Sequence, residues 1–113
     1  MSEGRLPTGL WMEIHLKNLT ARAVPFYFVQ KGNEASGLVL LKLNGMKGAV
    51  KLLTQQRDFE DNKLIWVNAL DEETVEEAQA DAYIQRAVDR DPDLWALEIE
   101  DENMNNPFED DAA

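Results

Sequence analysis

An α+β fold is predicted for this chain: a mainly antiparallel sheet of about five strands with two helices, in the order helix-strand-strand-strand-strand-helix-strand. Two observations predict it. Apolar residues recur at helical spacing near the start of the chain and again before Pro92, while strand-like alternation follows that proline. Between the helices lie four short apolar segments separated by turn residues. Their connections are too short for crossovers, so we expect a meander of consecutive strands with both helices on one face.

Length and composition fit one domain. The chain has 113 residues, of which 44% are hydrophobic, and no cysteine, which allows one core and excludes disulfides and cysteine-based zinc sites. We expect an N-terminal arm over residues 1–8, the α+β domain over 9–102 and an acidic disordered tail over 103–113. The start lacks the apolar region of a signal peptide, and no run approaches the ~18 apolar residues of a membrane span. A cytoplasmic location is therefore expected.

The segment 10–23 fits two structures. Strict alternation favours a strand, in which Leu10, Met12, Ile14 and Leu16 share one face. Helical spacing instead places Met12, Leu16, Leu19 and Ala23 on one face. The pattern persists for about 14 residues without a turn signal, whereas strands average ~5 to 6. Length therefore favours a helix, with Thr8 as its N-cap.

Four strands are predicted next, and Asn44-Gly45 gives the strongest turn signal among them. A type I′ hairpin needs positive φ at both central residues, which asparagine and glycine tolerate, and Gly48 allows a longer loop or a bulge. The turn should pair the second strand with the third. The predicted strands span residues 26–31, 37–43, 49–55 and 63–69.

The second helix is expected to begin near Asp71. Thr74 and Glu77 have the spacing of a capping box, and Pro92 ends the helix because it restricts the residue before it. Its sheet-facing stripe consists of Ala80, Ile84, Ala87 and Val88. In the last strand, 94–100, alternation places Trp95, Leu97 and Ile99 on one face and Glu98 and Glu100 on the solvated other face.

The charge is unevenly divided. Residues 71–113 carry 16 acidic and 2 basic side chains, net −14, and residues 1–70 carry 6 acidic and 9 basic, net +3, which together give −11. This balance disfavours binding to nucleic acid or to an anionic membrane, both of which require clustered lysine and arginine. It favours a basic protein partner, since complementary charge speeds association.

Carboxylates near the C-terminus provide the candidate metal ligands Asp91, Asp93, Glu98 and Glu100. The spacing of Asp89, Asp91, Asp93 and Glu100 copies that of four EF-hand ligands. However, Leu94 stands where the loop needs glycine, and a strand follows. A magnesium-dependent hydrolase would also need a lysine near the reacting phosphate, and Lys42, Lys51 and Lys63 are the candidates on neighbouring strands. We expect no metal and no cofactor.

Other chemistry has little support. His15 is the only histidine, and neither serine has the context of a nucleophile, so His15 is expected at the surface or a boundary. The aromatic content allows an exposed patch that a homodimer would bury. Phe108 among acids in the tail has the composition of a docking peptide. The candidate partner-binding residues are Trp95, Glu98, Glu100 and Phe108.

Four segments carry a resemblance to a known family: the start of the first helix, the region around the second strand, the second helix, and the stretch from Asp91 to Asp101. The matching residues are Arg5-Leu6-Pro7-Thr8 with Leu10-Trp11, Gly32, Ser36-Gly37, Leu40-Leu41-Lys42, Glu77-Ala78, Ala80 to Ile84, Asp91 to Trp95, and Glu98 to Asp101. On these residues the chain resembles the alphaproteobacterial domain-of-unknown-function family 1491, over about residues 5–102. The resemblance implies a bacterial cytoplasmic protein and supports a helix after Trp11, and it supplies no activity and no catalytic residues.

The sequence thus favours a non-enzymatic interaction or accessory protein with an acidic C-terminal surface. The alternative is a metal-dependent hydrolase, acting on phosphodiesters or similar substrates, that uses the C-terminal carboxylates.

Overall fold

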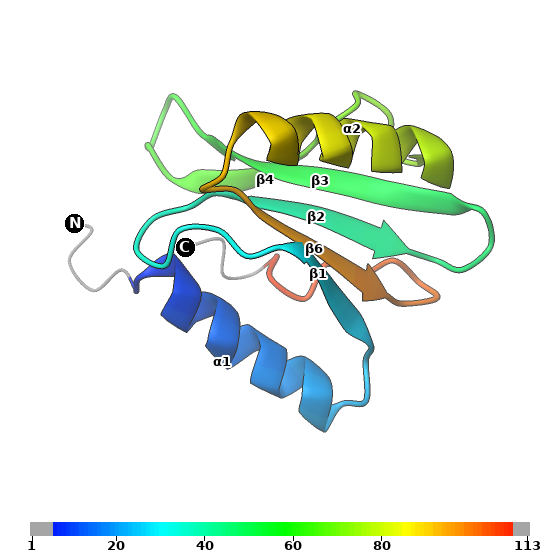
Figure 1. The fold of residues 1–113 in the computed structure, drawn as a ribbon, viewed down its shortest axis with the longest axis horizontal. Helices are drawn as coiled ribbons and strands as arrows, with labels where there is room; N and C mark the ends of the chain where they lie inside the picture. Colours follow the sequence, from blue (N-terminus) through cyan, green and yellow to red (C-terminus); the bar gives the residue numbers. More distant parts are fainter. Residues whose placement is uncertain (1–5, 110–113) are drawn as a thin grey trace.

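The computed structural model of the chain describes residues 6–109 and confirms the α+β class (Figure 1). Two helices and a mixed, mostly antiparallel sheet occur in the predicted order, with one extra two-residue strand before the second helix. The elements are α1 (Thr8–Ala21), β1 (Phe26–Gln30), β2 (Val39–Asn44), β3 (Ala49–Arg57), β4 (Leu64–Asn68), β5 (Val75–Glu76), α2 (Glu77–Arg90) and β6 (Trp95–Glu100).

The strand order is β1-β6-β2-β3-β4, with β5 paired to β3. The hairpins β2–β3 and β3–β4 are antiparallel as predicted. The expected pairing of β1 with β2 is wrong, because β6 lies between them, antiparallel to β1 and parallel to β2. Burial explains the insertion. Four of the six residues of β6 are buried and the other two are half-buried, which suits a central strand, whereas β1 alternates between half-buried and exposed residues, as an edge strand does.

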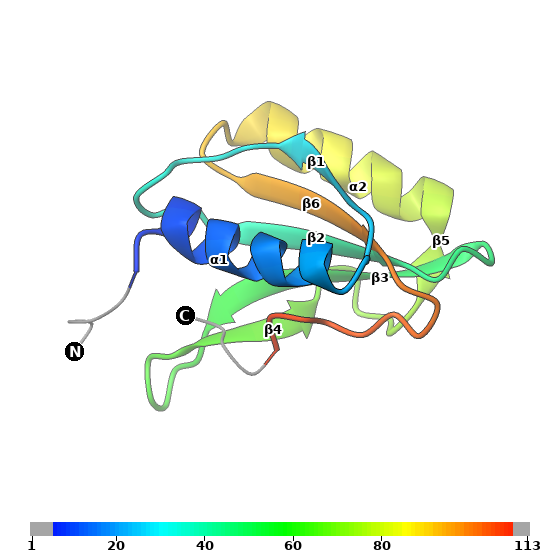
Figure 2. The same ribbon diagram turned by 90° about the horizontal axis from the view of Figure 1, so that it is seen from below.

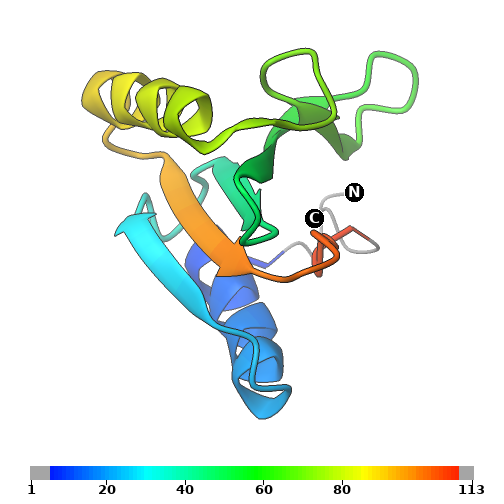
Figure 3. The same cartoon turned by 90° about the vertical axis from the view of Figure 1, so that its right-hand side faces the viewer.

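The two helices cover opposite faces of the sheet, so the expectation of one shared face is wrong (Figures 1 and 3). Every residue of β2 is buried. Its alternate side chains Val39, Leu41 and Leu43 pack with α1, and Leu40 packs with α2. Both faces of β2 are buried, and each therefore needs a cover.

Both helix starts differ from the predicted caps. The N-cap of α1 is Pro7, not Thr8, and it has no side-chain bond; the N–H groups of Thr8 and Gly9 donate to carbonyls of the loop before β2 instead. The predicted capping box at Thr74 and Glu77 is also wrong. Val75 is buried and pairs with Val50, so residues 75–76 are extended and α2 starts at Glu77. The predicted stripe on α2 does pack against the sheet.

The β2–β3 turn is longer than a type I′ turn. β2 continues through Asn44, and the positive φ values fall at Met46 (63°) and Gly48 (97°). The side chain of Asn44 accepts a hydrogen bond from the N–H of Met46 at 2.7 Å. This side-chain hydrogen bond stabilises the turn. Of the two predicted alternatives, the longer loop that uses Gly48 is therefore the one observed.

The segment after β6 packs into the core as far as it is described. Phe108 is 0% exposed and lies among Trp11, His15 and Trp66, with ring centroids at 5.1, 4.7 and 6.1 Å. Figure 2 shows this segment crossing beneath β3 and β4 on the α1 side of the sheet. The expected disordered tail is therefore wrong for residues 103–109, and residues 110–113 lie outside the described part of the chain.

Candidate functional site

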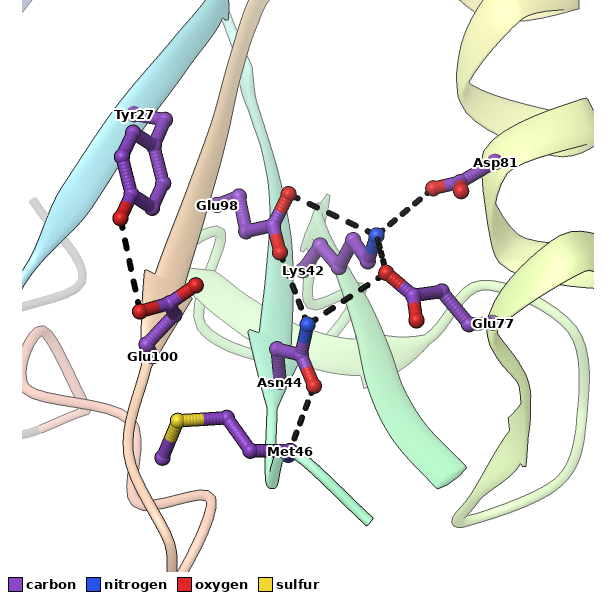
Figure 4. A network of polar contacts seen from close by, with 8 residues as sticks. All are labelled: Tyr27, Lys42, Asn44, Met46, Glu77, Asp81, Glu98 and Glu100. Carbon is purple, nitrogen blue, oxygen red and sulfur yellow. Dashed lines mark hydrogen bonds and ion pairs between the residues drawn. The ribbon is translucent and has the colours of Figure 1, made fainter. Parts of the chain in front are cut away.

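Lys42 lies at the centre of a polar network between the sheet and α2 (Figure 4). Its side chain is 3% exposed, and its Nζ lies 2.7 Å from Oδ1 of Asp81, 2.8 Å from Oε2 of Glu77 and 3.5 Å from Oε1 of Glu98. Asn44, two residues along the same face of β2, donates to Oε2 of Glu98 at 2.9 Å. Strand alternation explains the placement, because Lys42 and Asn44 share the face that Leu40 presents to α2.

The network keeps Lys42 protonated. Burial acts to lower the pKa of Lys42, but the hydrogen bonds to Asp81 and Glu77 and the charge of Glu98 outweigh burial and raise the pKa above its ordinary value. A lysine that acts as a base or nucleophile needs a lowered pKa. Lys42 is therefore a fixed cation that neutralises part of an acidic surface.

Beside this network, part of the sheet has no helix over it. Helix α2 packs on Leu40, Val50, Leu52 and Ala96, on β2, β3 and the start of β6. Farther along, Tyr27 and Val29 of β1 are 51% and 49% exposed. We call the surface formed by Tyr27, Val29, Glu98 and Glu100 the open face.

The open face is acidic and aromatic. Tyr27 pairs with Glu98 across β1 and β6, and its hydroxyl donates to Oε1 of Glu100 at 3.4 Å (Figure 4). Glu98 and Glu100 are half-buried. Lys42 contacts Glu77, Asp81 and Glu98. With Glu100, these four carboxylates and one lysine have a net formal charge of −3. This arrangement suits the recognition of a cationic group.

The four candidate metal ligands do not form one site. Asp91 and Asp93 lie in the turn before β6, where the side chain of Asp91 accepts a hydrogen bond from the N–H of Asp93. Glu98 follows Asp93 by five steps of mostly extended chain, which separates the two residues by about 15 Å. Within residues 6–109, no three histidine, aspartate or glutamate side chains are placed to hold a metal ion.

The aromatic candidates for partner binding lie in the core. Trp95 is 3% exposed, and its indole N–H donates to the carbonyl of Asn33 at 2.9 Å. Phe108 is fully buried. Of the four predicted residues, the structure brings Glu98 and Glu100 together on one surface and places the two aromatic rings on the other side of the sheet, with α1.

Asn44 and Tyr27 were missed as site residues from sequence, and Lys42 was considered only as a lysine near a metal-bound phosphate. A signal was available for Lys42, because it interrupts the apolar stretch of β2, and a lysine in a central strand needs acidic partners. Those partners come from α2 and β6, far away in the sequence. Their convergence depends on the unpredicted insertion of β6 beside β2.

Two larger cavities open elsewhere on the molecule. One, of about 540 Å³, lies between the β3–β4 hairpin and residues 104–109, and its walls include Leu53, Trp66 and Asn106. The other, of about 480 Å³, lies between α1 and β1. Both fall in the size range of ligand pockets. Within residues 6–109, no helix is long and apolar enough to cross a bilayer.

Fold and site together define a small α+β protein with one helix on each face of a mixed sheet and a lysine-centred ion cluster under the second helix. The family described as "Protein of unknown function (DUF1491)" matches residues 6–109. The chain belongs to this family.

Solved structures of relatives share the fold. The crystal structure of a DUF1491 family protein from Caulobacter crescentus CB15 is 27% identical, with a TM-score of 0.76 over 88% of this chain and 92% of that one. An NMR structure of a DUF1491 family protein from the same organism is 26% identical, with a TM-score of 0.75 over 90% of this chain and 91% of that one. Protein Atu0922 from A. tumefaciens, at 21% identity and 0.65 over 86% of each chain, is similar in fold. The search of curated proteins found no match.

Proposed function

We propose that this protein is a non-enzymatic protein-interaction module that binds a basic partner on its open face. The observation that carries the proposal is the incomplete cover of the sheet: α2 lies over β2 and β3, and Tyr27 and Val29 remain about half exposed beside Glu98 and Glu100. Tyrosine is enriched at interfaces because its ring gives a large apolar contact and its hydroxyl a polar one.

Charge supports a basic partner. The carboxylates around the open face exceed the single cation of Lys42, and the whole chain carries −11. An arginine side chain can stack on Tyr27 and bond a carboxylate at the same time. Such contacts combine the affinity of a stacked ring with the selectivity of a charge pair.

The geometry gives the metal-dependent hydrolase less support. Glu98 already bonds Asn44 and pairs with Lys42, and Asp91 and Asp93 lie at the opposite end of β6. A two-metal or one-metal site needs carboxylates that converge on one point. No second function is therefore proposed.

The test compares two variants that each remove one negative charge. A short arginine- and tyrosine-containing peptide is titrated by calorimetry at 150 mM salt against the wild type, Glu100→Gln and Glu72→Gln. Glu72 is exposed and lies before α2, away from the open face. We expect Glu100→Gln to weaken binding by about fivefold or more, about 1 kcal/mol, and Glu72→Gln by less than about twofold. Equal losses would mean diffuse attraction to the acidic chain and would contradict the proposal.

A further inference from the structure

The edge of the sheet beside the open face has unused backbone hydrogen-bonding groups. Among the described residues, β1 pairs only with β6, so one side of β1 has no neighbouring strand. An edge strand of this kind is a template for a further strand.

The hydrogen bonds of β6 show which groups of β1 point outward. The N–H of Trp95 donates to the carbonyl of Leu38, just before β2, and the N–H of Asp101 donates to the carbonyl of Asn44 in β2. In contrast, the N–H of Glu100 donates to the carbonyl of Pro25, just before β1. Odd-numbered residues of β6 therefore bond to β2, and even-numbered ones bond to β1. Tyr27, the partner of Glu98, directs its backbone groups toward β6.

It follows that the N–H and C=O groups of Phe26 and Phe28 point away from the sheet, because bonded and non-bonded positions alternate along an antiparallel pair. The alternation ends after Phe28, where a bulge shifts the register before Gln30. A bulge limits how far an edge can extend by pairing. The available stretch is short and runs from Phe26 to Phe28.

On the α1 side, this edge opens into the cavity of about 480 Å³ between α1 and β1. Its lining is mixed, and the Nζ of Lys31 lies 5.1 Å from the ring centroid of Phe28. The apolar part consists of Met12, Leu16, Phe28 and Trp95, and the charged part of Glu13, Lys17, Lys31 and Glu34. Side chains on one face of an added strand would point into this cavity. The apolar part of the lining therefore suits apolar side chains at every second position of an incoming segment.

On the opposite side, the same added strand would lie next to Tyr27 and Val29. The carboxylates of Glu98 and Glu100 lie on β6, two strand spacings away, about 10 Å. A long cationic side chain reaches across the ring of Tyr27 toward them. This side therefore suits basic side chains at the alternate positions.

The geometry points to β-strand addition at β1: a partner segment in which apolar and basic residues alternate pairs with Phe26–Phe28, its apolar side chains in the α1–β1 cavity and its basic side chains over the open face. The inference rests on the proposed function and names the recognition mode and the chemistry of the partner. A second copy fits less well, since its own β1, Phe26–Gln30, has no basic residue and each copy carries −11.

The test uses two peptides of the same composition, one with valine and arginine alternating and one with the valines and arginines in separate blocks. Each is titrated into the full-length protein at 150 mM salt while backbone amide signals are followed by NMR. We expect the alternating peptide to bind at least about fivefold more tightly. It should also slow hydrogen exchange of the Phe26 and Phe28 amides at least about tenfold, since they gain partners.

Two variants, each of which replaces an exposed aromatic side chain by arginine, provide a further control. Tyr27 and Phe59 are 51% and 100% exposed, and Phe59 lies in the β3–β4 loop. We expect Tyr27→Arg to weaken the alternating peptide about fivefold and Phe59→Arg less than about twofold. Equal effects would overturn the inference.

The remaining outcomes separate the two proposals. If both peptides bind equally, with changes at Tyr27 and Glu100 and none at the amides of Phe26 and Phe28, strand addition is overturned and the open face stands as the basic-partner site. If neither peptide binds at millimolar concentration, both the proposed function and strand addition are overturned. If the amides of Phe26 and Phe28 shift with protein concentration alone, a second copy is the occupant and the inference is overturned.

Discussion

The Nζ of Lys42 lies 2.7 Å from Oδ1 of Asp81, which joins the central strand β2 to helix α2 by an ion pair that is buried on the lysine side and 56% exposed on the carboxylate side. The asymmetry explains why the pair is stabilising. Lysine is the desolvated partner, and it is surrounded by three acids, while the acids keep part of their hydration. The full desolvation penalty of a buried pair is thereby avoided.

Replacing Lys42 by methionine should destabilise the fold. The change keeps the apolar stem but leaves Glu77, Asp81 and Glu98 close together without their cation, so we expect a loss of about 2–4 kcal/mol in the free energy of unfolding. Lys51→Met is the matched control, since Lys51 lies 3.8 Å from an 80% exposed Glu73. It should change stability by less than about 0.5 kcal/mol. Urea unfolding of both variants checks the difference, and similar losses would contradict a special role for Lys42.

The same lysine predicts a pH dependence. Although burial acts to lower it, the pKa of Lys42 in the folded protein lies above its ordinary value of 10.5, because the bonds to Asp81 and Glu77 and the charge of Glu98 prevail. Above pH 10.5 the folded state therefore binds more protons than the unfolded state, and stability falls as pH rises. Below pH 10.5 the contribution is complete. Unfolding free energies from pH 8 to 11.5 should fall more steeply for the wild type and Lys51→Met than for Lys42→Met, and equal slopes would exclude the effect.

Two motifs of the family resemblance meet in space. A Cβ on Gly37 would collide with the carbonyl of Asp93 and lie 2.8 Å from Cδ1 of Trp95, and one on Gly32 would meet the same carbonyl. The N–H of Asn33 donates to that carbonyl at 3.0 Å, and Trp95 donates back to Asn33. The glycines therefore allow the β1–β2 loop to pack on the turn that leads into β6.

Gly37→Ala should cost about 1–3 kcal/mol, because the colliding atom belongs to the backbone and cannot move alone. Gly45→Ala is the comparison, since the nearest atom there, 3.2 Å away, is in the flexible side chain of Met104. We expect it to cost less than about 1 kcal/mol. Thermal unfolding measures both, and a tolerated Gly37→Ala would mean that the loop and turn are not held together as described.

Local patterns predicted the elements and the β2–β3 and β3–β4 hairpins, but not the position of β6 in the sheet. The helical spacing of Met12, Leu16 and Leu19 and the stripe on α2 were sufficient to predict both helices, and alternation predicted which residues of β6 face α1. Periodicity is a local property, so it cannot tell which strands pair when the chain returns from a helix. The insertion of β6 between β1 and β2 depends on long-range packing, since four of the six residues of β6 are buried there.

The site could be predicted only in part, because sequence patterns are local and the site depends on long-range packing. Glu98 and Glu100 were identified from their position on one face of a strand, and both lie on the open face. Lys42 was considered only as a possible neighbour of a metal, and its real partners depend on α2 and β6 packing around β2. A charge imbalance located the acidic half of the chain, but burial decides which acids are paired.

The segment after β6 provides the last prediction. Composition suggested a disordered tail because Phe108 stands among polar and acidic residues, yet one aromatic side chain fills the gap between Trp11, His15 and Trp66. Phe108→Ala should therefore cost about 3–5 kcal/mol, a large share of the ~5–15 kcal/mol that stabilises a typical domain.

Phe59→Ala is the control, because Phe59 is 100% exposed, and it should change the free energy of unfolding by less than about 0.5 kcal/mol. Denaturant unfolding followed by tryptophan fluorescence reports directly on the rings that Phe108 contacts. If Phe108→Ala proves as stable as Phe59→Ala, residues 103–109 contribute nothing to the core and the expectation of a detached tail is restored. If the loss is large, the fold extends at least to Phe108, and any truncation that removes this residue should unfold the protein at lower denaturant.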